Sequence, residues 1–416
     1  MDKSFRQINN CRLCNSHNLN KFIDFGNVPL GNNLQLNKLD AKEASSYVLD
    51  IMRCAECGHF QLGIAVNPEI LYATNYTYLS GIGATFINHI SEYAEWVKKN
   101  CLLAKNSFVV DIGSNDGTCL KAFQRLGHNV CGVDPASLPA AIANENGINT
   151  INSFFDSDVV TKIVNQFGYA DFITSQNVLA HVDNLKDVFE NIYKLLKKGG
   201  YFAFEIGYFR EVLEVGCFDT IYHEHLDYHH ATPLAKHLCS LGFDLLNLSV
   251  NSIQGGTLRL LFRKTGKGKI FKQARDFLNN EQKSILYNNE FLEGWRSKIN
   301  ETMNEFRRLI ELETKKGAKI VAYGAPTKAT LLMRMANINP SDIIFIVEDN
   351  PHKSDRFMPG TGIPIFPTSK LFDYKPDVII ILAWNFADDI ITKLKHQLNY
   401  SPKLIIPLPK IKIVEL

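Results

Sequence analysis

The sequence predicts an α/β protein in which two parallel sheets are covered by helices and follow a small cysteine-bearing region. Three observations support this. From about residue 86 to 265, short apolar runs alternate with stretches of helical periodicity, and beyond Lys316 the same alternation restarts. Residues 1–85 show no such alternation and hold two C-x2-C pairs. Because short apolar runs separated by helices are typical of buried parallel strands, we expect three domains, at 1–85, 86–265 and 266–416.

The composition is that of a soluble globular protein. At 416 residues the chain exceeds one typical domain, and its 45% hydrophobic and 21% charged residues are ordinary values. A net charge of +2 without a Lys/Arg-rich tract argues against a nucleic-acid partner. The N-terminus lacks a signal-peptide core, and the apolar run 378–384 is too short to span a bilayer. We therefore expect a cytoplasmic monomer or homodimer without a membrane partner.

Four of the nine cysteines form the two C-x2-C pairs, and the other five are scattered. Thiolates three residues apart can occupy two corners of a zinc tetrahedron, and a second pair supplies the other two. Four sulfur ligands leave no open position for catalysis. The spacing therefore predicts one structural Zn²⁺ per chain and a reducing compartment. The predicted ligands are Cys11, Cys14, Cys54 and Cys57.

An apolar run, Phe108–Ile112, leads into a glycine-bearing turn and then into helical periodicity. Glycines at such a turn let the backbone approach a ligand closely, and the following helix offers free N–H groups to it. A second strand ends at Asp134, the position at which an acidic side chain usually grips an adenosine ribose. The turn therefore predicts an adenosine cofactor, bound by Asp111, Gly113, Gly117 and Asp134.

The spacing of the turn indicates which adenosine cofactor is bound. Dinucleotide folds use G-x-G-x-x-G, whereas this turn reads Gly113-x-Asn115-x-Gly117 after Asp111. It resembles the first motif of class I S-adenosylmethionine (SAM) methyltransferases. The resemblance implies SAM as cofactor and a Rossmann-like, seven-stranded sheet, with Asp111 near the methionine half. Two later strands, 243–250 and 257–262, are separated by Gly255-Gly256, which predicts the antiparallel hairpin that ends such a sheet.

A cluster of histidines, acids and tyrosines spans residues 219–230 and follows the strand 201–206. We expect this cluster at the carboxyl edge of the sheet, beside the cofactor. Histidine titrates near neutrality and can remove a carbon-bound proton, so the cluster predicts acid–base chemistry. A polar surface loop is the alternative, and the spacing lacks the H-E-x-x-H register of a metal site. Asn177 and His181 follow the fourth strand and belong to the same predicted edge.

The C-terminal third predicts a second α/β unit. A polar linker, 264–269, precedes a long amphipathic helical tract that runs to about Lys316. Apolar runs at 319–323, 343–347, 378–382 and 403–406 then alternate with helices. This pattern predicts a smaller, Rossmann-like three-layer domain.

Motifs in all three regions resemble one family, the SAM-dependent sugar C-methyltransferases of antibiotic and cell-surface deoxysugar pathways. The resemblance covers nearly the whole chain. The motifs in chain order are the four cysteines with Gly58-His59-x-Gln61-Leu62, Asp111–Gly117, Ile221-Tyr222-x-Glu224-His225, Tyr323-Gly-Ala-x-x-Lys328, Asp349-Asn-Pro-x-Lys353, Pro359–Pro364 and Ala383-Trp384-Asn385.

The resemblance implies C-methylation of a nucleotide-linked 4-keto-6-deoxyhexose, at C3, through an enolate, in branched deoxysugar biosynthesis. It implies a structural zinc and a C-terminal domain that contributes to nucleotide-sugar binding. By motif position, His225 is the candidate base, and Tyr222 and Glu224 orient it or stabilise the enolate oxygen. His181 is a further candidate catalytic residue. The residues that match the family's substrate site are Tyr76, Asn177, His181, Tyr222 and Lys328, of which Asn177 also matches the cofactor site and Lys328 is followed by Ala329 instead of glycine.

Several alternatives remain open from the sequence. The methylated carbon can be C3 or C5, the nucleotide can be thymidine or guanosine diphosphate, and the base can be Tyr222, His225 or a neighbour. A SAM-dependent enzyme that methylates a hydroxyl or RNA is a second hypothesis. A non-catalytic, zinc-containing assembly protein is a third, although the presence of both Asp111 and Asp134 argues against it.

Overall fold

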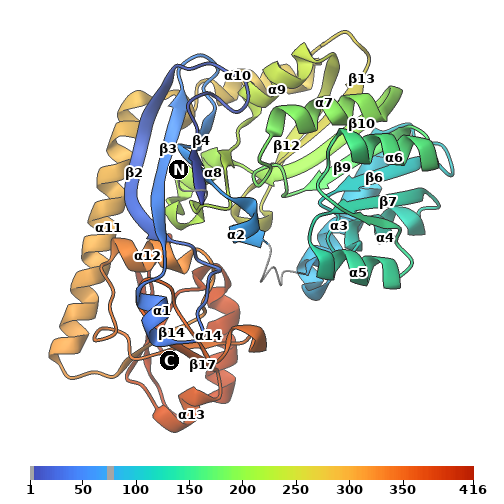
Figure 1. Ribbon diagram of the computed structural model, residues 1–416. Helices are drawn as coiled ribbons and strands as arrows, with labels where there is room; N and C mark the ends of the chain where they lie inside the picture. The colour runs from blue at the N-terminus through green and yellow to red at the C-terminus, as the bar shows by residue number, and fades with distance from the viewer. Residues whose placement is uncertain (1–3, 73–78) are drawn as a thin grey trace.

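The computed structural model describes residues 4–72 and 79–416. Figure 1 shows three groups of strands: the N-terminal sheet at the upper left, a large sheet with its helices on the right, and a C-terminal α/β unit at the lower left. The long helix α11 (Asn289–Lys315) runs beside β2 of the N-terminal sheet and down to the C-terminal unit.

The N-terminal sheet is antiparallel, with the strand order β11-β4-β3-β2. Its strands are β2 (Leu19–Pro29), β3 (Ser46–Cys54), β4 (Phe60–Leu62) and β11 (Asp227–Tyr228). A two-stranded sheet joins β1 (Phe5–Gln7) to β5 (Ile64–Val66), and the helices here are α1 (Lys38–Lys42) and α2 (Pro68–Tyr72). Strand β11 belongs to the histidine-rich cluster, so that cluster is hydrogen-bonded to the N-terminal sheet.

The central sheet has seven strands in the order β12-β13-β10-β9-β6-β7-β8. Five are parallel, namely β6 (Phe108–Ile112), β7 (Asn129–Asp134), β8 (Thr150–Asn152), β9 (Ala170–Gln176) and β10 (Leu196–Gly207). The antiparallel hairpin of β12 (Phe243–Asn251) and β13 (Thr257–Lys264) ends the sheet. The predicted seven-stranded sheet and its terminal hairpin are confirmed. Strand order reverses at β6 and β9, and ligands of open α/β sheets bind beyond the carboxyl ends of strands at such a point.

Helices cover both faces of this sheet, as the apolar strands require. Successive residues of β6 point to opposite faces, so Val109 packs in a cluster with α3 and α4, while Val110 packs in the larger core with α6, α7 and α9. The helices are α3 (Ala84–Asn100), α4 (Thr118–Arg125), α5 (Ser137–Glu145), α6 (Ser157–Phe167), α7 (Leu185–Leu195), α8 (Phe209–Val215) and α9 (Ala231–Ser240).

The C-terminal sheet has the order β16-β17-β15-β14-β18-β19-β20, with five parallel strands between two antiparallel edge strands. Its strands are β14 (Ile320–Tyr323), β15 (Ile346–Glu348), β16 (Arg356–Phe357), β17 (Pro364–Pro367), β18 (Val378–Ile381), β19 (Lys403–Ile406) and β20 (Lys412–Glu415). Helices α10 (Lys272–Glu281) and α11 precede it, and α12 (Ala329–Met335), α13 (Lys370–Tyr374) and α14 (Ala387–Gln397) accompany it.

Within the described residues there are also six short 3-10 helices: η1 (Ser80–Ile82), η2 (Phe218–Thr220), η3 (Ile253–Gly255), η4 (Ile285–Tyr287), η5 (Pro351–Lys353) and η6 (Trp384–Phe386). Helix α11 buries one stripe of side chains, including Trp295, whose ring stacks on Phe22 of β2 at 5.8 Å between centroids. Among the helices of residues 4–72 and 79–416, none combines the length and the apolarity that a membrane crossing needs.

Candidate active site and metal centre

The turn after β6 has the backbone conformation that its glycines were expected to permit. Gly113, Asn115 and Gly117 have φ angles of +70°, +50° and +78°, in the left-handed region that glycine adopts readily and asparagine tolerates. A Cβ atom on Gly113 would lie 2.3 Å from Cγ2 of Val178, so a side chain has no room there. The turn therefore brings backbone N–H groups to the carboxyl edge of β6.

Two buried carboxylates flank this turn. Asp111 is 1% exposed, and among the described residues its Oδ1 has no hydrogen-bond partner. Burial, with a smaller effect of the Asp134 charge, raises the pKa of Asp111 well above its usual range. Asp134 Oδ2 accepts a bond from the Asn115 N–H at 2.8 Å, and Oδ1 accepts one from the Ala136 N–H at 2.8 Å.

These carboxylates fit SAM. A buried carboxylate oxygen without a partner is costly unless a cationic or donor group reaches it, and SAM carries an ammonium and a sulfonium. Each carboxylate oxygen of Asp134 can accept a second bond, as the two ribose hydroxyls require. Asp111 would hold the methionine half and Asp134 the ribose, and the bound cofactor would supply an electrophilic methyl group.

The segment around η1 was missed by sequence reasoning. Its backbone N–H groups are held by the turn: Ser80 donates to Asn115 Oδ1 at 2.9 Å, and Gly81 donates to Asp116 Oδ2 at 2.8 Å. The available signal was the adjacent pair Asn115-Asp116, two short side chains that readily accept bonds from nearby backbone N–H groups. Tyr76 lies outside the described residues, so its predicted place in the substrate site stays a prediction.

His225 lies in the loop between η2 and β11 and is paired at both ring nitrogens. Nδ1 is 3.0 Å from the Thr220 carbonyl oxygen, and Nε2 is 2.8 Å from the Tyr222 hydroxyl. A carbonyl only accepts, so Nδ1 carries the proton of the neutral ring and Nε2 accepts from Tyr222. Burial, reinforced by the neighbouring His181, lowers the pKa of His225 to about 3. The imidazole is therefore neutral, and its free lone pair is on Nε2 and accepts from the Tyr222 hydroxyl.

His181 and Asn177 reach the same place from the carboxyl end of β9. The rings of His181 and His225 meet edge to face at 4.8 Å between centroids, and His181 Nδ1 donates to the Glu224 carbonyl oxygen at 2.8 Å. Burial lowers the pKa of His181 to about 4. The Asn177 N–H donates to the Glu205 carbonyl oxygen at 2.8 Å, which joins the ends of β9 and β10. The structure thus brings the two predicted segments together.

Glu224 connects the histidine-rich cluster to the regions of the N-terminal and C-terminal sheets, which we call the outer sheets. Its Oε1 accepts from Asn32 Nδ2 at 2.8 Å, and Asn32 Oδ1 accepts from the Thr327 hydroxyl at 2.6 Å. Burial raises the pKa of Glu224 to about 7, although the Asn32 bond and the Lys353 charge oppose the shift. Thr327 lies in the turn between β14 and α12, so the C-terminal sheet contributes to the surroundings of the predicted catalytic residues.

Lys328 is the next residue in that turn, and its ammonium group has protein partners. Nζ lies 3.7 Å from Asp219 Oδ2 and 3.8 Å from the centroid of the Trp384 ring. Burial lowers the pKa of Lys328, and the Asp219 carboxylate opposes the shift. A contact between Lys328 and substrate stays a prediction.

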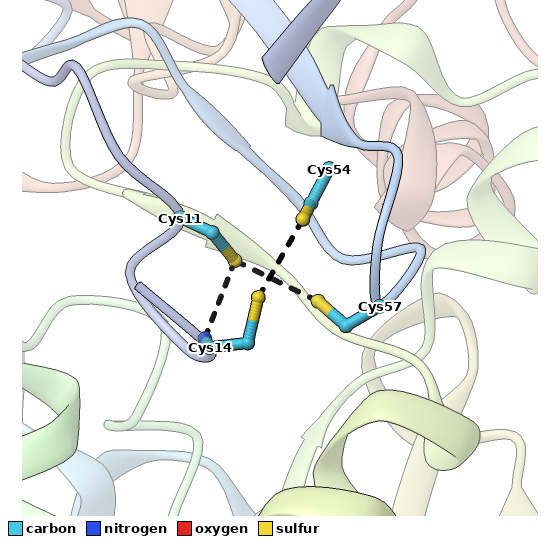
Figure 2. Close-up of side chains that lie close together, drawn as sticks. All are labelled: Cys11, Cys14, Cys54 and Cys57. Carbon is cyan, nitrogen blue, oxygen red and sulfur yellow. Dashed lines mark hydrogen bonds between the residues drawn. The ribbon is translucent and has the colours of Figure 1, made fainter. Parts of the chain in front are cut away.

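The four predicted zinc ligands converge (Figure 2). Their sulfur atoms lie within 4.8 Å of one another, with the Cys11–Cys57 and Cys14–Cys54 pairs each 3.6 Å apart. Two sulfurs bound about 2.3 Å from a tetrahedral zinc lie about 3.8 Å apart, so the cage fits this ion. Burial raises the pKa of three other cysteine thiols, those of Cys101, Cys131 and Cys217, to about 12.

Three family models match the chain in order. They describe a zinc binding domain at residues 11–72, a methyltransferase domain at 87–248 and a C-methyltransferase C-terminal domain at 252–409. C-methyltransferase NovU of Streptomyces niveus is 27% identical over 415 residues, which are 100% of this chain and 99% of NovU. The chain is a SAM-dependent C-methyltransferase. The predicted enzyme class is confirmed. The zinc prediction is confirmed as well, because the matched zinc binding domain contains the four clustered cysteines.

Solved structures overlap with this C-methyltransferase over less than half of its length. ChlM, the magnesium protoporphyrin IX methyltransferase of Synechocystis PCC 6803 with bound SAM, covers 43% of this chain and 79% of its own at 14% identity and a TM-score of 0.33. The plantazolicin methyltransferase BpumL covers 43% and 84%, at 11% identity and a TM-score of 0.34.

Asp134→Ala is expected to weaken SAM binding by the C-methyltransferase about ten- to hundredfold, because hydrogen bonds to a charged group contribute about 1.5–3 kcal/mol. Isothermal titration measures the affinity. Asp171→Ala is a matched control, since Asp171 also accepts a backbone N–H, that of Phe108 at 2.8 Å, but at the amino end of β6, whereas Asp134 accepts from Asn115 in the turn beyond its carboxyl end. Unchanged affinity in Asp134→Ala would remove the ribose assignment.

Proposed function

We propose that the enzyme transfers the SAM methyl group to C3 of a nucleotide-linked 4-keto-6-deoxyhexose, in the biosynthesis of branched deoxysugars. The observation that supports this most directly is the neutral His225 imidazole, held at Nδ1 by a carbonyl and paired at Nε2 with a phenol. Methylation of a hydroxyl oxygen does not call for a base that removes a carbon-bound proton, whereas carbon methylation next to a ketone does.

In this proposal the C4 ketone acidifies the C3–H bond, and His225 Nε2 takes that proton. The C–H electron pair forms the enolate, whose C3 attacks the methyl carbon, and the S–CH₃ bond breaks to leave S-adenosylhomocysteine. Tyr222 donates to Nε2 in the resting site. When substrate binds, the Tyr222 hydroxyl turns to the ketone oxygen. This exposes the lone pair on His225 Nε2 and stabilises the enolate.

The low pKa of His225 needs an offsetting interaction, because a buried imidazolium is unfavourable. The developing enolate supplies it. An anion about 4 Å from the imidazolium contributes about 4 kcal/mol at an effective dielectric constant near 20, which corresponds to about three pK units. The enolate therefore offsets the lowering that burial imposes on the pKa of His225 and makes the proton transfer less unfavourable. The imidazolium releases its proton to solvent after methyl transfer, which restores the neutral ring.

The C-terminal sheet contributes to nucleotide-sugar binding in this proposal. The turn after β14 begins at Gly324, which has a φ angle of +89°, and the Ala325 N–H donates to Glu348 Oε2 at the end of β15 at 2.8 Å. This is the arrangement of a glycine turn and an acidic residue on neighbouring strands that α/β folds use for nucleotides. Lys353 donates to the Ala325 carbonyl at 2.9 Å and places a cation beside the turn.

The test is a panel of thymidine- and guanosine-diphosphate-linked 4-keto-6-deoxyhexoses incubated with SAM, with product mass and the methylated atom read by NMR. We expect a 3-C-methyl product, and solvent deuterium incorporation at C3 when SAM is left out. A C5 product would correct the carbon, and an O-methyl product would remove the enolate. The absence of both product and exchange across the panel would overturn the substrate class.

The activity is expected to rise with pH through a midpoint near 7, the pKa to which burial raises Glu224. Above that pH the carboxylate is ionised, and both oxygens can then accept bonds, one from Asn32 and one from a substrate hydroxyl. The pKa values of His181 and His225 are too low to add a limb between pH 5 and 9.

The pH dependence of kcat/KM checks this, with Glu224→Gln expected to remove the limb near pH 7. Glu145→Gln, at the exposed end of α5, is the control and should keep it. A limb that persists unchanged in Glu224→Gln would assign the titration to another group.

A further inference from the structure

The predicted catalytic residues Tyr222, Glu224 and His225 all lie in the 219–227 loop, which begins and ends with a buried carboxylate. Asp219 is 0% exposed and Asp227 is 2% exposed. Each is paired with a cation from a turn outside the central sheet: Arg12 precedes β2 of the N-terminal sheet, and Lys328 follows β14 of the C-terminal sheet. A buried charge is unfavourable without such a partner, so both pairings constrain where the loop ends can lie.

The first end is held by the C-terminal sheet. Asp219 Oδ2 accepts from Trp384 Nε1 at 2.5 Å and lies 3.7 Å from Lys328 Nζ. The Lys328 ammonium makes a cation–π contact with the Trp384 ring, 3.8 Å from its centroid. Lys328 and Trp384 follow the carboxyl ends of β14 and β18, which are adjacent parallel strands. One edge of the C-terminal sheet therefore positions Asp219.

The second end is held by the cysteine-bearing region. Asp227 Oδ1 accepts from His59 Nε2 at 2.8 Å and from Arg12 Nε at 3.0 Å. Arg12 lies between Cys11 and Cys14, and its backbone N–H donates to Gln61 Oε1 at 2.8 Å. Burial would raise the pKa of Asp227, but the Arg12 charge and the His59 bond outweigh it and lower the pKa to about 2. The carboxylate therefore stays ionised.

The contacts that orient His225 lie immediately inside these two ends. Thr220, whose carbonyl accepts from His225 Nδ1, is the residue after Asp219. Leu226, next to His225, donates to the Ala180 carbonyl at 2.7 Å, and its own carbonyl accepts from the Leu62 N–H at 2.9 Å. A shift of either loop end therefore displaces an atom that sets the orientation of the imidazole.

We propose that Lys328 with Trp384, and Arg12 with His59, are positioning residues that hold the 219–227 loop from its two ends so that the outer sheets together set the orientation of His225. This inference rests on the proposed function for its catalytic consequence. It also gives Lys328 a role through Asp219, whereas the family resemblance places Lys328 at the substrate.

The test uses the full chain with Asp219→Asn, Lys328→Met and Asp227→Asn, which remove charge while keeping side-chain size. Asp171→Asn is the matched control, because its ion pair with Lys197 is partly exposed and far from the loop ends in the sequence. Amide hydrogen exchange of residues 219–227 reports loop order. Deuterium incorporation into the keto sugar without SAM reports the step assigned to His225, and titration reports SAM affinity.

We expect amide exchange in the loop to quicken about tenfold or more in all three variants, and sugar enolisation and kcat to fall about ten- to hundredfold, since small displacements of a reacting group are that costly. SAM affinity should stay within about twofold, and Asp171→Asn should resemble wild type. If Lys328 contacts substrate, Lys328→Met should instead raise KM and leave amide exchange in the loop unchanged. That result would overturn the positioning role.

Unchanged loop exchange in Asp219→Asn and Asp227→Asn would overturn the inference, and so would a loosened loop with undiminished enolisation. If wild type enolises no keto sugar, the proposed function fails, and amide exchange alone then upholds or overturns the anchoring of the loop. Should Lys328→Met not fold, Trp384→Phe removes the indole N–H bonded to Asp219 while keeping an aromatic ring beside Lys328, and the same outcomes uphold or overturn the positioning role. Zinc content is measured in Asp227→Asn to show that the cysteine cage is intact.

Discussion

His225→Ala is expected to lower kcat about a hundred- to ten-thousandfold, the range that general bases contribute. The variant loses the Nε2 lone pair that is to take the C3 proton, while the glycine turn and both carboxylates of the SAM site are untouched. Solvent deuterium exchange at C3 without SAM should fall by the same factor. SAM affinity, measured by titration, should stay near that of wild type.

Two further variants sharpen this result. His128→Ala replaces a half-buried histidine away from the site and should keep full activity. Tyr222→Phe keeps the ring but removes the hydroxyl bonded to Nε2, and a smaller loss is expected there. If His225→Ala loses less than tenfold, the base is another residue, and His181 and Glu224 are the nearest candidates.

Cys14→Ser is expected to abolish stoichiometric zinc binding and to unfold the N-terminal sheet. Structural zinc in small domains contributes about 10–16 kcal/mol to folding, which is comparable with the whole stability of a typical domain. Cys14 is exposed, so the substitution removes a ligand with little loss of packing. Zinc content by mass spectrometry and the thermal unfolding curve are the two measurements.

Cys239→Ser is the matched control, because Cys239 is also incompletely buried and lies outside the cysteine cage. It should retain one zinc per chain and the wild-type unfolding curve. Less than half an equivalent of zinc in wild-type protein purified without chelator would contradict the assignment. Because Arg12 lies between two of the ligands, loss of zinc is also expected to free Asp227 and lower activity.

Much of the fold could be predicted from local pattern. The apolar run 108–112 coincides with β6, and the two runs around Gly255-Gly256 form the expected hairpin. The strand expected at 343–347 begins only at Ile346, and β8 was not predicted because its three residues are too short to show a period. The ends of such strands depend on which neighbouring strand they pair with, and the local sequence does not reveal that neighbour.

The candidate site was also predicted from local pattern, that is, from residues that are close in sequence. Tyr222 and His225 are three positions apart, and their bond needs only a loop. The bond between Asp116 and Gly81 was missed, because the pair Asn115-Asp116 indicates that the turn can accept backbone N–H groups but not which distant segment donates them. The same holds for Asn32, which reaches Glu224 from the turn after β2.

By itself the sequence determined the chemistry that is available here: four thiolates at zinc spacing, a glycine turn with two acids, and a histidine cluster after a strand. Only the tertiary structure decided how that chemistry is held. It pairs Arg12 with Asp227, 215 positions along the chain, and Lys328 and Trp384 with Asp219. The physical reason is that a buried charge must find its partner in space, and the packing of three sheets, not the spacing of residues, brings that partner within reach.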